Sequence, residues 1–126
     1  MILVDSDVLI DLVGVEPTRS ARAARRLEAA ALLGPLCINP IIYTEWSMAF
    51  ADGAGLERAM AAGGLVLEAI PTAALVLAGK SYALERAAGL SLATRLIGAH
   101  ALVADLRLLT NGEQAYRTAF ARIRFS

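Results

Sequence analysis

The sequence predicts an α/β fold in which helices cover both faces of a mainly parallel sheet of about five strands. Two observations carry this prediction. Short apolar runs recur along the chain, and Ala-rich segments with helical periodicity separate them. Strands that alternate with helices form parallel sheets, because each helix returns the chain to the edge where the previous strand began. The 126 residues suit one domain, 1–126, with a single hydrophobic core.

The apolar runs give the expected strands, which are Ile2–Val4, Leu36–Ile38, Leu65–Leu67, Arg107–Leu109 and Ile123–Phe125. The periodic segments give the expected helices, which are Thr18–Leu33, Pro40–Phe50, Thr72–Ala88, Thr94–Ala104 and Gln114–Phe120. A further helix is expected to start just after Asp5. Pro40 suits a first helical turn, where its missing N–H costs nothing. The glycines at 53–55 and 63–64 are expected to lie in connections.

Composition narrows the class of protein. The chain is 57% hydrophobic and carries no formal net charge, which excludes a disordered chain and a globally basic nucleic-acid binder. No apolar stretch approaches the ~20 residues of a membrane span, so we expect no membrane association. The single cysteine, Cys37, excludes a disulfide framework. No basic segment precedes the first strand, which favours a cytoplasmic protein. Surplus apolar surface favours a homodimer or a partner protein.

Asp5 is the first candidate functional residue. It follows the apolar run Met1–Val4, at the expected carboxyl end of a buried strand. Ligands of open α/β sheets bind at that edge. Glu45 lies in the expected helix Pro40–Phe50, which begins at the same edge. Its carboxylate is either a solvated helix acid or a partner of Asp5, with a shared cation balancing the two charges.

Three motifs identify a resemblance. They are Val4-Asp5-Ser6-Asp7-Val8-Leu9-Ile10-Asp11, Asn39-Pro40-Ile41-Ile42-Tyr43-Thr44-Glu45, and Leu96-Ile97-Gly98-Ala99-His100-Ala101-Leu102 followed by Leu108-Leu109-Thr110. Together they resemble the PIN-domain family, which includes the VapC-type toxins of bacterial toxin–antitoxin pairs. The resemblance spans essentially the whole chain. It implies a small three-layer α/β/α sandwich, a cognate antitoxin as partner and RNA as substrate.

The resemblance also implies the chemistry. In the family, acids at the sheet edge bind Mg²⁺ or Mn²⁺, and the metal assists hydrolysis of RNA phosphodiesters. Asp5 matches the family's first acid and Glu45 its second, so both are expected metal ligands and catalytic residues. Thr94 and Gly112 stand where the third and fourth acids are expected. Two carboxylates imply weakened metal binding and weak or absent ribonuclease activity.

Neighbouring residues offer substitutes and alternatives. Asp7 either assists Asp5 or caps the first helix. Asn111 offers a neutral oxygen to the site. Glu113 is near enough to help, but Thr110-x-x-Glu113 has the pattern of a capping box, in which the Glu reaches back to its own helix start. Asp105, at the far end of the Thr94–Ala104 helix, is too distant.

Basic residues cluster on the expected helix Thr18–Leu33. Arg19, Arg22, Arg25 and Arg26 share neighbouring positions there, and they form either a solvated face or a contact with RNA phosphates or an acidic partner. Arg95, next to Thr94, would disfavour a cation but could bind a phosphate.

Two competing functions remain. The first is a catalytically inactive PIN-fold protein that binds an antitoxin or RNA. The second is a haloacid-dehalogenase-type phosphatase, with Asp5 as nucleophile and Asp7 as acid/base. The second is disfavoured because that chemistry requires a later acidic pair, and none follows Lys80.

Overall fold

A five-stranded sheet, in which every neighbouring pair is parallel, organises the protein. The computed structural model describes all residues, 1–126. The strands are β1 (Ile2–Val4), β2 (Leu36–Ile38), β3 (Leu65–Leu67), β4 (Arg107–Leu109) and β5 (Arg124–Phe125). Their spatial order is β3-β2-β1-β4-β5. The first four strands have the predicted bounds, and the fifth is one residue shorter than predicted.

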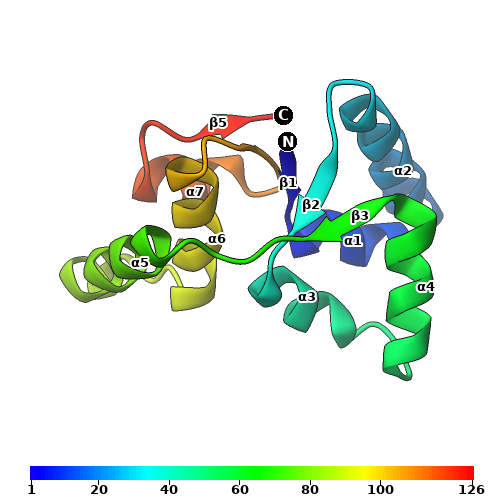
Figure 1. Ribbon diagram of the computed structural model, residues 1–126, viewed down its shortest axis with the longest axis horizontal. Coiled ribbons are helices and arrows are strands. Elements are labelled where there is room, and N and C mark those ends of the chain that lie inside the picture. The colour runs from blue at the N-terminus through cyan, green and yellow to red at the C-terminus, as the bar shows by residue number, and fades with distance from the viewer.

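Helices connect the strands. They are α1 (Ser6–Val13), α2 (Pro17–Ala31), α3 (Pro40–Ser47), α4 (Gly53–Gly63), α5 (Thr72–Leu84), α6 (Leu92–Val103) and α7 (Glu113–Ala119), with a 3-10 turn at Arg86–Ala88. Figure 1 shows α5, α6 and α7 on one side of the strands and α2 and α4 on the other. The predicted α/β fold with a parallel sheet is confirmed. None of the helices combines the length and apolarity needed to cross a bilayer.

The middle of the sheet is the core. All three residues of β1 and of β2 are buried, as expected for parallel strands covered on both faces. Trp46 and Ile42 of α3 and Ile97 of α6 are almost fully buried against them. His100 of α6 is also buried, and its Nδ1 lies 3.1 Å from Asn39 Nδ2 at the start of α3. It is the packed, hydrogen-bonded histidine typical of an apolar helix.

Helix α4 is the one element that the sequence did not predict, because Gly53, Gly55 and Gly63 suggested a flexible connection. Local chemistry explains it. Asp52 caps its start, accepting from the Gly55 N–H at 2.9 Å. Leu56 and Met60 are spaced by one helical turn and bury one face. Gly64 ends the helix in the left-handed region, with φ of 63°.

The strand order places the functional edge. After β1 the chain adds β2 and β3 on one side of β1, and later β4 and β5 on the other. The carboxyl ends of β1 and β4 therefore flank the switch in strand order, which is where open parallel sheets bind ligands. Asp5 follows β1 and Thr110 follows β4. Their backbones are joined by a 2.9 Å hydrogen bond from Asp5 N to Leu109 O.

Candidate active site at the carboxyl edge of the sheet

A shallow hollow of about 240 Å³ lies at this edge. We call it the acid pocket. Its lining comes from four helices, with the loops at their starts: Asp5, Ser6, Asp7, Glu45, Leu90, Thr94, Ile97, Gly112, Ala115 and Tyr116. The structure thus brings together Asp5, Asp7, Glu45, Thr94 and Gly112, as the sequence predicted. It does not bring Asn111, Glu113 or Arg95 into the lining.

Asp5 is held by its neighbours from all sides. Its side chain is the N-cap of α1, and Oδ1 accepts from the Ser6 N–H at 2.7 Å. Oδ2 accepts from the Thr110 hydroxyl and the Tyr116 hydroxyl, each at 2.8 Å. Only 5% of the residue is exposed. Such bonding compensates a buried carboxylate for its lost hydration, so Asp5 is stable here without a cation.

Glu45 approaches Asp5 through Ser6. The Ser6 hydroxyl donates to Glu45 Oε1 at 2.9 Å and lies 3.4 Å from Asp5 Oδ1. The start of α3 explains the placement: Asn39 caps it, accepting from the Ile42 N–H at 2.9 Å, and Pro40 forms its first turn. The reading of Glu45 as an isolated solvated acid is therefore wrong. It contributes a carboxylate to the acid pocket, one hydroxyl away from Asp5.

Asp7 is the acid of the pocket whose pKa is shifted. Burial and, secondarily, the charge of Asp5 raise its pKa to about 6. Its Oδ2 accepts from the Asn111 N–H at 3.0 Å and from the Thr110 hydroxyl at 3.2 Å, whereas its buried Oδ1 has no partner. Asp7 does not cap the first helix, because Asp5 does. Its side chain instead ties α1 to the end of β4.

Thr94 and Gly112 occupy the remaining sides of the pocket without supplying a charge. The Thr94 hydroxyl accepts from Ser91 Oγ at 3.0 Å, and Ser91 in turn caps α6. Gly112 donates its N–H to Thr110 Oγ1 at 3.0 Å. A Cβ built on Gly112 would meet only Thr110 Oγ1, at 3.8 Å. The position therefore has room for the side chain that it lacks.

Tyr116 is the functional residue that sequence reasoning missed. It lies in α7, is 4% exposed, and donates its hydroxyl to Asp5 Oδ2. Burial and the nearby Asp5 carboxylate raise its pKa, so the phenol stays protonated. Gly98 makes the approach possible: a Cβ there would lie 2.8 Å from the Phe120 ring and 3.0 Å from the Tyr116 ring. The sequence did contain a signal for its role. Tyr116 lies in the second turn of a helix that starts at the carboxyl edge of the sheet.

The oxygen atoms of the acid pocket fit a divalent cation poorly as ligands. Mg²⁺ prefers carboxylate oxygens, yet no three acidic, histidine or cysteine side chains converge in the structure. Both oxygens of Asp5 already accept protein hydrogen bonds. Within the Asp5–Glu45 pair, only Glu45 Oε2 has no protein donor bonded to it. A cation that used Asp5 Oδ2 would compete with the Thr110 and Tyr116 hydroxyl groups that now bond to it.

Two sequence-based expectations are corrected for residues outside the lining, Arg95 and Glu113. Arg95 is fully buried and donates to Ser81 and Glu85, so it joins α6 to α5 and cannot reach a phosphate. Glu113 does not form a capping box. The helix begins after Gly112 with no side-chain cap, and Glu113 pairs with Arg117 at 3.4 Å.

Asn111 does not face the acids with its side chain. Its Oδ1 accepts from Arg26, and its Nδ2 donates to Asp11 Oδ2 at 3.1 Å. It belongs to a second hollow of about 340 Å³, which we call the basic hollow. The lining is Asp11, Arg19, Arg22, Ala23, Arg26 and Asn111. Arg25, on the same helix, lies outside it.

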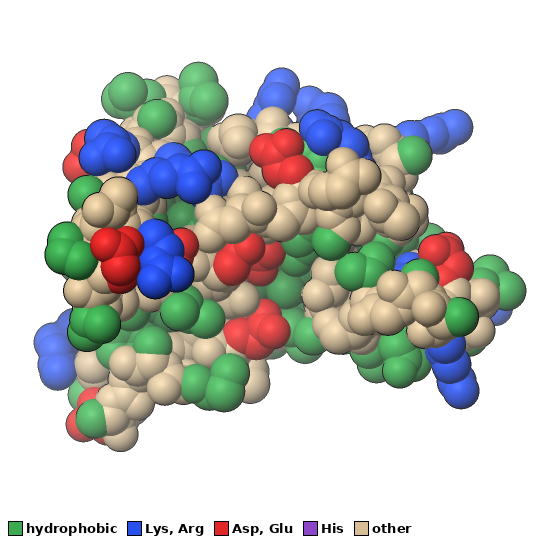
Figure 2. All heavy atoms as spheres, turned by 180° about the vertical axis from the view of Figure 1, so that it is seen from behind, with side chains coloured by type: hydrophobic (Ala, Val, Ile, Leu, Met, Phe, Trp, Pro, Cys, Tyr) green, Lys and Arg blue, Asp and Glu red, His purple; other side chains and the backbone are tan.

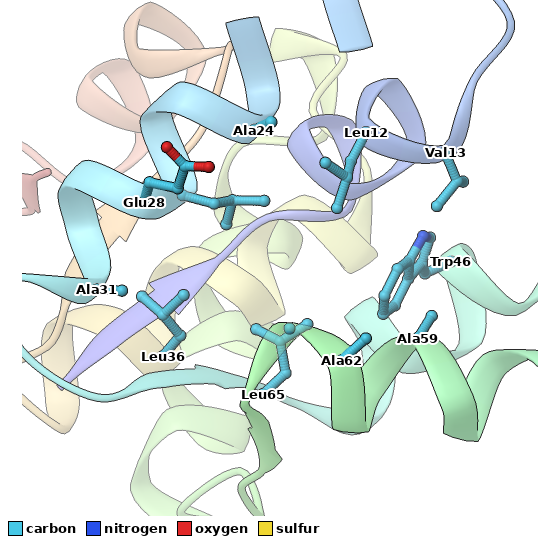
Figure 3. A pocket seen from close by; sticks show the side chains of 12 residues that line it. Leu12, Val13, Ala24, Glu28, Ala31, Leu36, Trp46, Ala59, Ala62 and Leu65 are labelled. Carbon is cyan, nitrogen blue, oxygen red and sulfur yellow. The ribbon is translucent and has the colours of Figure 1, made fainter. Parts of the chain in front are cut away.

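A third depression is an apolar groove of about 440 Å³ (Figure 3). Figure 3 shows its labelled side chains pointing into the space between α1, α2 and α4. The lining is Leu12, Val13, Ala24, Leu27, Glu28, Ala31, Leu36, Trp46, Ala59, Ala62, Gly63 and Leu65. Glu28 is its one charged residue. The indole N–H of Trp46 is buried and has no acceptor.

Comparison with known proteins agrees with this architecture. A chain of FitAcB from Neisseria gonorrhoeae superposes with a TM-score of 0.70 at 16% identity, covering 100% of this chain and 97% of that one. A chain of VapBC2 from Rickettsia felis, bound to a DNA fragment from its promoter, gives 0.74 at 14% identity, covering 100% and 98%. A chain of a toxin–antitoxin complex from Klebsiella pneumoniae gives 0.66 at 26% identity, covering 98% and 92%.

The likenesses at 14% and 16% identity establish the fold alone. No curated protein matches the chain in sequence. The family model described as PIN domain, however, matches residues 2–121. With that match over nearly its whole length, the chain belongs to the PIN-domain family.

Proposed function

We propose that this protein is a VapC-type toxin whose acidic site binds Mg²⁺ or Mn²⁺ weakly and hydrolyses RNA slowly or not at all. One observation carries the proposal. Asp5 and Glu45 are one hydroxyl apart at the carboxyl edge of the sheet, but Thr94 and Gly112 add no charge beside them. The pair retains the position of a phosphodiester site and lacks the full charge that would hold a metal there.

The residues present explain why slow cleavage is expected. Asp5, Asp7 and Glu45 place negative charge where a phosphate has to approach, and that charge repels the phosphate unless a cation is bound. Two carboxylates can hold Mg²⁺ together with water and substrate oxygens. The hydroxyl groups of Thr110 and Tyr116 compete for Asp5. Metal binding therefore carries the cost of breaking those hydrogen bonds.

The alternative is a PIN-fold protein that has lost catalysis and binds an antitoxin or RNA. The apolar groove supports antitoxin binding, which both the proposal and its alternative include. A helix presenting a row of apolar side chains could bury them in such a groove. Glu28 at the rim suits a basic residue of the partner. Relatives of this fold have been crystallised as toxin–antitoxin complexes.

Titration with Mn²⁺ tests the proposed site. The Thr94→Asp/Gly112→Asp double variant restores two acids, and a Cβ at Gly112 meets no close contact. We expect it to bind Mn²⁺ more tightly than the wild type in calorimetry and to gain ribonuclease activity. The Gly79→Asp/Thr118→Asp variant adds the same charge outside the pocket and should change neither quantity.

The opposite outcome is equally clear. Robust Mn²⁺-dependent RNA cleavage by the wild type, lost in Asp5→Ala, would show that the two carboxylates suffice and that the site is not degenerate. Equal metal affinity in the wild type and both double variants would show that Thr94 and Gly112 are not the missing ligand positions.

We also propose self-association. Leu75, Val76 and Leu84 of α5 and Leu92 at the start of α6 are apolar and exposed. Helices α5 and α6 lie on the other side of the strands from α2 and α4 (Figure 1), so a dimer made through them would leave the groove open. Light scattering of the purified protein should give twice the monomer mass. The Leu75→Glu/Val76→Glu variant should be monomeric.

A further inference from the structure

We propose that the basic hollow is a binding subsite for a backbone phosphate of single-stranded RNA, next to the phosphate that would lie in the acid pocket. This inference rests on the proposed function and deepens it, because it identifies how this chain holds a polyanion beside a negatively charged site. It assigns Arg19, Arg22 and Arg26 to the substrate and excludes Arg25.

Arg26 is set in place by neutral groups. Its guanidinium donates to Asn111 Oδ1 and, at 2.7 Å, to the backbone carbonyl of Thr110. No carboxylate pairs with it or with Arg22, and the Arg19–Glu16 pair is exposed. Asp11, the acid in the lining, is bonded to the amide of Asn111. The hollow therefore keeps an excess of positive charge on guanidinium groups, which suit phosphate oxygens because they donate two parallel hydrogen bonds.

The two hollows adjoin through consecutive residues. Asn111 lines the basic hollow and Gly112 lines the acid pocket, and neighbouring Cα atoms are ~3.8 Å apart. The Asn111 N–H also bonds Asp7 of the acid pocket. A strand that placed one phosphate in the acid pocket would thus bring an adjacent part of its backbone over Arg26 and Arg22.

Helix α2 separates this site from the apolar groove. Positions 19, 22, 23 and 26 line the basic hollow, and positions 24, 27, 28 and 31 line the groove. Each set has the spacing of one helical face. Ala23 is the only hydrophobic residue of the basic hollow, so it offers nothing to bury an apolar helix. Figure 2 shows several blue basic side chains along the upper part of one face of the molecule, above red carboxylates near its centre.

Anisotropy of a short fluorescein-labelled single-stranded RNA, titrated with protein in EDTA, tests the subsite without metal or catalysis. We expect Arg22→Ala to weaken binding about tenfold, the size of one charged contact. The slope of log K against log salt should become shallower by about 0.7, which is one phosphate contact on a single strand. Arg25→Ala removes the same charge from the same helix and should change neither value.

Three results would overturn the subsite. They are equal losses in Arg22→Ala and Arg25→Ala, no RNA binding by the wild type in EDTA, and displacement of the RNA by poly-glutamate as readily as by unlabelled polyuridylate. The last would assign the hollow to an acidic protein segment. Failure of the subsite is separable from failure of the proposed function, because Mn²⁺ titration of the Thr94→Asp/Gly112→Asp variant does not involve α2.

Discussion

The apolar groove and the acid pocket are both concave, but they differ in what they lack. The groove has an almost wholly apolar lining, with Glu28 as its one charged residue. The acid pocket has its carboxylates tied up by Ser6, Thr110 and Tyr116, and two of its positions carry no acid. The groove is open to an apolar ligand from outside. In the acid pocket most carboxylate oxygens accept hydrogen bonds from the chain itself, and Asp7 Oδ1 and Glu45 Oε2 are the exceptions.

The difference bears on the two activities proposed for this chain. An apolar groove keeps its affinity if its shape and apolar lining persist. A metal-dependent site needs several charges at once, and each missing acid weakens it. Partner binding should therefore be strong and nuclease activity weak. The substitutions below test this contrast, in decreasing order of expected effect.

Ala62→Arg places a charge in the groove wall. We expect it to weaken binding of the proposed antitoxin by about 100-fold, ~3 kcal/mol, because the long side chain would fill the groove and its guanidinium would lose water beside a lining in which Glu28 is the only carboxylate. Calorimetry with the co-expressed antitoxin measures this. Ala61→Arg, one residue away, exposed and outside the lining, is the control and should bind normally. Equal losses in the two variants would move the interface away from the groove.

Gly98→Ala tests how α7 is brought over the acids. The added methyl would collide with the Phe120 and Tyr116 rings, so we expect a loss of about 3 kcal/mol in unfolding free energy. Urea titration followed by the fluorescence of Trp46, the only tryptophan, measures it. Gly79→Ala in α5 has open space around it and should instead stabilise by roughly 0.5–1 kcal/mol. An unchanged free energy of unfolding in Gly98→Ala would mean that the close approach of α6 and α7 is not required for stability.

Tyr116→Phe removes one donor from the buried Asp5 carboxylate. We expect a stability loss of about 2 kcal/mol together with tighter Mn²⁺ binding, since Asp5 Oδ2 becomes available. Tyr43→Phe is the matched control, because its hydroxyl makes a similar 2.7 Å bond to Glu57 at the exposed surface, and exposed changes cost under about 0.5 kcal/mol. Unchanged metal affinity in Tyr116→Phe would show that the hydroxyl does not compete with the ion.

Asp7→Asn should alter the pH dependence of stability. The pKa of Asp7 rises from 3.8 in the unfolded chain to about 6 in the folded one, so the folded state binds more protons between those values. Stability contributed by this group therefore falls as pH rises from about 4 to 6. Thermal unfolding at pH 4 and pH 7 should show a smaller decline in the variant. Parallel curves would indicate that Asp7 is not desolvated.

Much of the fold followed from local pattern. Alternating strand-like and helical segments predicted the parallel sheet, and four strands had the predicted bounds. Helix α4 was not predicted, because its glycines suggested a connection. The cap at Asp52 and the pair Leu56 and Met60, one helical turn apart, were the signals in favour of a helix. Capping contacts involve only neighbours in the chain, but their weight against glycine depends on the burial of one face, which depends on the rest of the fold.

The sequence alone predicted the parallel sheet, the position of Asp5 at a strand end and the lack of acids at 94 and 112. Which polar side chains form hydrogen bonds with one another became known only from the tertiary structure. It turned Arg95 inward to Ser81, directed Asn111 to Arg26, and brought Tyr116 onto Asp5 through the close contact at Gly98. Periodicity reports which face of an element is buried. Hydrogen bonding between side chains distant in sequence depends on how elements pack, and that packing is set by the whole core.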